Sequence, residues 1–132
     1  MKKIDTQKGF DIYFAAEKCD MNMRTHFIDE CGWSKKEYAS LTKTKPKWFV
    51  AHVVVKKAGI ELGEAYLGGC CYSSVEEFYT KYKSDYFADM VNEAMAEAQN
   101  RLPDVIKSLK SQANAALTTV KALESDQTAH SK

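Results

Sequence analysis

Two adjacent cysteines, Cys70 and Cys71, are the residues of this chain whose type and position most resemble a reactive site. They follow Gly68 and Gly69 and come just before two serines that mark the start of a helix. A strand, two glycines and a helix N-terminus can together form an anion cradle, and a thiol placed there has a lowered pKa. The sequence therefore allows a thiol enzyme acting through Cys70 or Cys71 as one hypothesis.

Other features of the same stretch disfavour this chemistry. A phosphate-binding loop requires the spacing G-x-x-x-x-G-K-[ST], which is absent here. Glu76 and Glu77 would occupy the first turn of the following helix and repel an anion. The strand pairing expected below places His52 opposite Ala65, about 16 Å along the strand from Cys70 and too far to act as its base. We therefore expect both cysteines to be structural thiols.

Metal and acid–base chemistry are also disfavoured. Cys19, His26 and Cys31 are possible zinc ligands, but their spacing fits no zinc-finger pattern and the chain has no C-x-x-C pair. No pair of carboxylates stands out, because every acid falls in a capping or solvent-facing position of an expected element. The sequence therefore predicts no metal, no cofactor and no enzyme activity.

Charge is distributed in blocks, although the formal net charge is only +1. Residues 34–57 contain seven lysines and one acid, whereas residues 61–97 contain eight acids and two lysines. Lysines with interleaved aromatic residues are typical of a nucleic-acid surface, so a nucleic-acid-binding protein is an alternative function. The acidic block that follows directly disfavours tight binding to DNA or RNA. The residues that would carry such binding are Lys43, Lys45, Lys47 and Trp48.

The acidic block also contains a row of four acids at helical spacing. Residues four apart lie on one face of a helix, and each like-charged neighbour costs about a few tenths of a kcal/mol, which a folded domain tolerates. This row is either a solvated helix face or the docking edge for a basic partner protein. The sequence does not decide whether this row or the lysine block is the binding surface. The row consists of Asp85, Asp89, Glu93 and Glu97.

Strands are expected where aromatic and β-branched residues cluster. Residues 9–16 and 48–57 have this composition, and Ala58-Gly59 makes a tight turn from which residues 60–72 return as a partner strand. Matching polarity across the pair favours one register. That register places Lys57 opposite Ile60, Lys56 opposite Glu61, Val55 opposite Leu62 and Val50 opposite Leu67.

Short helices are expected where capping signals precede apolar residues. Asp20 is expected to cap a helix over residues 21–31, which Gly32 ends. Ser34 and Glu37 form a capping-box pattern for a helix through Leu41. Paired serines at 73 and 74 predict a further helix through about residue 83.

A long helical segment is expected from about residue 85. Pro103 either starts a new helix or kinks a continuous one. Beyond it, apolar residues recur at alternating steps of four and three, which is the seam of a coiled coil. The seam predicts a homodimer through this helix. An antiparallel or bundle-like dimer is expected, because the paired flanking charges that would fix a parallel zipper are absent. In the competing account the helix folds back at Pro103 and buries the same residues within the monomer. The seam consists of Leu102, Ile106, Leu109, Ala113, Ala116, Val120 and Leu123.

These expectations combine into a single α+β domain over residues 1–124, followed by a disordered tail over 125–132. A small antiparallel sheet of about three strands is packed by helices and followed by the long C-terminal helical segment. The basic start lacks a following apolar segment, so no signal peptide is predicted and a cytoplasmic location is expected. By elimination, the expected function is a non-catalytic protein-binding module, an inhibitor or adaptor of the kind found among phage and mobile-element accessory factors.

Overall fold

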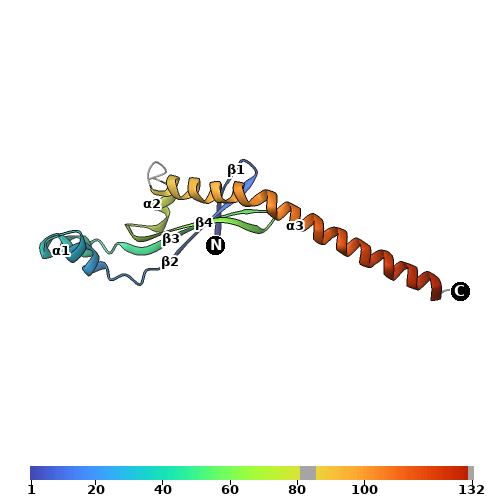
Figure 1. Cartoon of the computed structure of the whole chain (residues 1–132). Coiled ribbons are helices and arrows are strands. Elements are labelled where there is room, and N and C mark those ends of the chain that lie inside the picture. The colour runs from blue at the N-terminus through green and yellow to red at the C-terminus, as the bar shows by residue number, and fades with distance from the viewer. Residues whose placement is uncertain (81–85, 131–132) are drawn as a thin grey trace. The chain divides into compact units, whose positions relative to one another are not determined.

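The protein has an α+β fold in which a four-stranded antiparallel sheet packs against a long C-terminal helix (Figure 1). The computed structural model describes residues 1–80 and 86–130. The chain divides into two compact parts, Met1–Ala98 and Gln99–Lys132, where the sequence predicts one domain. The elements are β1 (Lys2–Gln7), β2 (Phe10–Lys18), η1 (Thr25–Glu30), α1 (Lys35–Lys43), β3 (Lys47–Lys57), β4 (Ile60–Tyr72), α2 (Val75–Thr80) and α3 (Tyr86–His130).

The sheet follows chain order, β1-β2-β3-β4, and therefore has one strand more than the sequence predicts. The additional strand is β1, an edge strand whose side chains are nearly all exposed. It gives no alternation of apolar and polar residues, which is the signal that identifies a half-buried strand. The three expected strands are present as β2, β3 and β4.

The β3–β4 hairpin keeps the expected register only next to its turn. Lys57 pairs with Ile60 and Lys56 with Glu61, as expected. A register shift then places Val55 opposite Gly63, because a bulge adds one residue to β4. The remaining expected pairs are wrong for this reason: Val55 does not face Leu62, Leu67 faces Ala51 in place of Val50, and His52 faces Tyr66 in place of Ala65.

The core of the first part lies between one face of the sheet and the helices α2 and α3. Phe14 of β2 packs against Phe78 of α2, with ring centroids 5.8 Å apart, and against Phe87 of α3 at 6.4 Å. At Gly63 the backbone of α3 comes so close that a Cβ would overlap the carbonyl oxygen of Ala94. The other buried residues of this layer include Ile12, Phe49, Ala51, Val53, Met90, Val91 and Ala98.

Capping explains where the short helices begin. Ser34 Oγ accepts from the Glu37 N–H at 3.1 Å and Glu37 Oε1 accepts from the Ser34 N–H at 3.2 Å, so the expected capping box is confirmed. The cap expected at Asp20 is wrong, because Asn22 Oδ1 accepts the Thr25 N–H at 3.0 Å. Met23 and Arg24 form an α-helical start before the π-helical residues, so Asn22 lies at the N-cap position of the whole helical segment, three residues before Thr25.

Helix α2 begins as the paired serines indicate, since Ser74 Oγ accepts the Glu77 N–H at 3.3 Å. The end expected near Lys83 and the acidic residue Asp85 both lie outside the described residues.

Helix α3 continues through Pro103, so the structure shows one helix and no restart at that residue. The proline ring cannot donate to the carbonyl of Gln99, four residues earlier. The helix also includes residues 125–130, where the sequence predicts a disordered tail. Among the described residues, no helix combines the length and apolarity that crossing a bilayer requires.

Candidate functional site

A groove with a volume of about 500 Å³ lies in the first part of the chain, along the C-terminal half of β4. Residues 67–72, which contain the doubled cysteine, supply one set of lining side chains. Facing residues come from the segment around η1 and α1, and one comes from the start of α3. These residues are His26, Phe27, Trp33, Leu41 and Tyr86.

Trp48 holds the aromatic side of this groove in place. Its indole Nε1 donates to the backbone carbonyl of Met21 at 2.8 Å. The Trp48 ring centroid lies 5.4 Å from His26 and 5.8 Å from Phe27, and Phe27 in turn packs against Trp33 at 4.6 Å. The sequence predicts Trp48 as a possible base-stacking residue, whereas the structure gives it a positioning role for the η1 segment.

A second bulge in β4 shapes the groove. The register shifts between Phe49 and Ala51, so Gly68 and Gly69 have no Cα partner on β3. Gly69 has a φ of +68°, the left-handed conformation that a side chain rarely adopts, and its Cβ would lie 3.3 Å from the Trp48 ring. A Cβ at Gly68 would contact only the Met21 methyl group, at 3.9 Å. The bulge therefore leaves a strand segment without side chains in the groove lining.

The doubled cysteine lies in surroundings that favour the uncharged thiol. Burial raises the pKa of Cys70 and of Cys71 above the usual value, which favours the uncharged thiol. The Cys70 Sγ donates to the Leu67 carbonyl at 3.3 Å. An anion cradle would lower these pKa values, so the raised pKa values disfavour the thiol-enzyme hypothesis at this pair.

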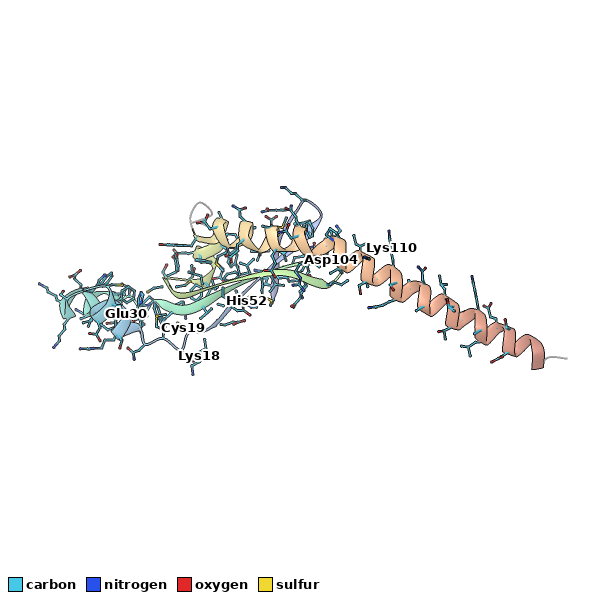
Figure 2. The ribbon with its side chains drawn as sticks, viewed as in Figure 1. Lys18, Cys19, Glu30, His52, Asp104 and Lys110 are labelled. Atoms are coloured by element: carbon cyan, nitrogen blue, oxygen red, sulfur yellow. The ribbon has the colours of Figure 1, made fainter. Side chains whose placement is uncertain are left out.

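A different cysteine lies next to a histidine. His26 Nε2 is 3.7 Å from Cys31 Sγ, and His26 Nδ1 is 3.1 Å from Glu30 Oε2 (Glu30 is labelled in Figure 2). This is the order of a nucleophile, a base and a residue that orients the base. The π-helical turn of η1 brings Cys31 to His26, since the Cys31 N–H bonds to the His26 carbonyl five residues earlier.

Sequence reasoning considers His26 and Cys31 only as zinc ligands and misses Glu30. The four-residue spacing of His26 and Glu30 was the available signal. Cys19, the third proposed zinc ligand, does not join them: no group of three metal-ligating side chains gathers in the part of the chain that the structure describes.

His52 belongs to a separate cluster on the sheet, near the centre of β3 (Figure 2). Its Nδ1 lies 2.8 Å from Glu17 Oε1 on β2 and its Nε2 lies 3.0 Å from Glu64 Oε2 on β4. The ring stacks on Tyr66 with centroids 3.9 Å apart, and the pKa of Tyr66 is raised by desolvation and by the charge of Glu64. An imidazolium donates to both carboxylates, whereas a neutral ring donates to one. The cluster ties three strands together and takes no part in the groove.

The lysines of residues 34–57 form two separate groups, one at each end of β3. Lys57 Nζ donates to the Gly9 carbonyl at 2.9 Å, and Lys56 Nζ lies 4.6 Å from the centre of the Tyr13 ring. Lys47 starts the strand, so about 30 Å of extended chain separates the two groups. The exposed lysines near the groove-forming elements are Lys35, Lys36, Lys43, Lys45 and Lys47.

The acidic row is only partly described. Asp89 and Glu93 are exposed on α3, Glu97 is half-buried, and Asp85 lies outside the described residues. The apolar side of the same helix segment packs on the sheet, so this row follows the solvent side.

Comparison with models of known protein families, with curated protein sequences and with solved structures found no match to this chain.

Proposed function

We propose that this protein is a non-catalytic, cytoplasmic binding protein, an inhibitor or adaptor, that acts as a homodimer paired through α3. The observation that carries the proposal is the exposed apolar seam in the second part of the chain. Ile106, Leu109, Val120 and Leu123 are between 42% and 57% exposed. Large apolar side chains repeated at a heptad spacing on one helix mark a protein-interaction surface.

The seam favours a second copy of the same chain because it is self-complementary in the antiparallel direction. If Ala113 faces Ala116 of the partner subunit, then Leu109 faces the partner's Val120 and Ile106 faces the partner's Leu123. The alanines at the centre allow the two helices to approach closely, and the larger apolar side chains on either side pack against each other in the flanking layers. A two-fold axis repeats each of these layers, as an isologous dimer requires.

The flanks of the seam disfavour a parallel zipper. In a parallel pair the flanking positions would join Val105 to Lys110, Gln112 to Leu117 and Thr119 to Glu124, and none of these pairs carries opposite charges. Parallel zippers are specified by such charge pairs.

Light scattering on size-separated protein tests the dimer. We expect a mass of twice 14.9 kDa for the wild type and a folded monomer for Leu109→Glu, which places a charge in the seam. The matched control, Ser111→Glu, adds the same charge to an exposed position outside the seam and should remain dimeric. Because α3 continues through Pro103 without a break, a fold-back of the helix at that residue is not available to bury the seam. A monomeric wild type, or a Leu109→Glu variant that stays dimeric, would refute pairing through this seam.

Nucleic-acid binding is the second candidate, favoured by the exposed lysines around α1. Anisotropy of labelled oligonucleotides across a salt series tests it. Sub-micromolar affinity at physiological salt, lost with a steep salt slope on replacement of Lys43, Lys45 and Lys47, would move this function to first place.

A further inference from the structure

We propose that the groove along residues 67–72 binds a short extended segment of a partner protein that carries apolar anchors and acidic residues. This inference rests on the proposed function, since it names the partner chemistry and the site of that binding activity. Three observations support it: the lining of the groove, the backbone at its bulge and the charge of the surrounding elements.

The groove lining suits apolar side chains. Phe27, Trp33 and Leu41 face Leu67 across a volume of about 500 Å³, which is the size of a small-ligand or side-chain site. Trp48 fixes the facing segment through its hydrogen bond to Met21. The site is therefore formed before a ligand arrives, and binding loses little conformational freedom on the protein side.

The edge position of β4 supplies backbone groups for the main chain of a ligand, and the bulge marks a point where a second chain can come close. β4 is an edge strand with β3 as its neighbour, and Gly68 and Gly69 have no Cα partner in the β3–β4 ladder. A glycine in a strand often marks a place where another backbone approaches closely. An extended segment can lie against this point and place alternate side chains in the groove, in the manner of peptide addition to a sheet edge.

The charge of the segment that faces β4 across the groove favours an acidic ligand, since residues 20–47 contain six bases against four acids. Among the described residues, no lysine lines the groove itself. Residues 34–47 contain five lysines and a single acid, Glu37. Glu37 is engaged in the capping box of α1, and Glu30 faces His26. These lysines are exposed, and no ion pair to them occurs among the described residues.

An acidic protein segment fits these features better than a nucleic acid does. Base stacking requires exposed ring faces, whereas Trp48 is half-buried among His26 and Phe27, and Phe27 also covers Trp33. The lining includes leucines and cysteines, which complement apolar side chains and offer no cation to a phosphate.

Selection from a display library of random twelve-residue peptides on the immobilised full-length protein tests the proposal. We expect enriched peptides in which apolar residues alternate with Glu or Asp. Their affinities are then measured by fluorescence anisotropy on four proteins. These are the wild type, Gly68→Phe, the triple variant of Lys43, Lys45 and Lys47 to Gln, and the control Ala96→Phe.

Gly68→Phe fills the groove at a position where a Cβ finds ordinary contact, and it should weaken binding about tenfold or more, as loss of an anchor site does. The lysine variant should weaken binding and flatten its salt dependence. Ala96→Phe adds the same ring to an exposed position of α3 and should bind as the wild type does.

Three results would overturn the inference. The library could yield no peptide whose binding is weakened by Gly68→Phe, or the enriched peptides could be basic. Labelled oligonucleotides could also bind more tightly than the peptides and lose that binding in the same variants. Light scattering on the same samples separates the two proposals. A dimer without peptide binding refutes the groove alone, and a monomer that binds peptide refutes the dimer alone.

Discussion

Replacing Gly63 by alanine should loosen the packing of α3 on the sheet. A Cβ at this position would overlap the carbonyl oxygen of Ala94 and lie 3.0 Å from the amide nitrogen of Ala98. Both atoms belong to the helix backbone, so no side-chain rotation can relieve the overlap. Either α3 moves away from β4 or the neighbouring bulge rearranges.

Overpacking of this kind costs about 1–3 kcal/mol. The loss of glycine flexibility in the unfolded chain returns about 0.4–1 kcal/mol, so the midpoints of the two ranges leave a net destabilisation of about 1.3 kcal/mol. For a folded part of this size, that lowers the melting temperature by roughly 5–10 °C. The change should appear in thermal melts followed by near-ultraviolet circular dichroism, which reports the aromatic core.

Gly68→Ala is the matched control, because its Cβ would lie 3.9 Å from a flexible methyl group. It should melt at or slightly above the wild-type temperature. Equal melting temperatures for the two variants would show that α3 does not press on Gly63, and the packing described for this layer would then be wrong.

Three further predictions concern separate sites. Cys31 should react faster with a chromogenic disulfide than Cys70 does, because burial raises the pKa of Cys70. The substitution His26→Gln should slow the reaction of Cys31 alone; an equal Cys31 rate in the wild type and in His26→Gln would show that the histidine does not activate this thiol. Ala58→Asn should raise the melting temperature by a few degrees, because φ at this turn is +52° and asparagine tolerates that conformation; an unchanged melt would contradict this. Hydrogen bonding to a neighbouring lysine lowers the pKa of Asp11, so its stabilisation is present above the unfolded pKa near 3.8 and is lost as pH falls through the folded value. Asp11→Asn should therefore destabilise the protein at pH 6, and this destabilisation should shrink as the pH falls below 3.8; a destabilisation that does not change with pH would rule out this origin.

Local signals predict the elements of this fold well. The capping box of Ser34 and Glu37 is confirmed because it depends on four consecutive residues and on no tertiary contact. The strands β3 and β4 were recognisable from composition and from the Ala58-Gly59 turn. The edge strand β1 was missed because its exposed side chains leave no apolar pattern to read.

Features that depend on contacts between distant parts of the chain could not be predicted from the sequence. The two bulges in β4 depend on how the strand fits against α3 and Trp48, and they shift every pair beyond Lys56. The neighbouring positions of His26 and Cys31 arise from a π-helical turn, which no simple periodicity indicates. The groove itself joins segments about forty residues apart in the chain, and only the fold brings them together.

Both edges of the sheet are interrupted by bulges, and this bears on how the protein resists aggregation. In β1 the pairing shifts between Lys3 and Asp5, and in β4 it shifts twice. An uninterrupted edge presents an even row of N–H and C=O groups on which another chain can add and continue without limit. Each bulge interrupts that row and increases the local twist, which disfavours continuous pairing along the whole edge but leaves room for a short segment at one point. The interrupted edges therefore protect the sheet against unlimited strand addition without any covering element.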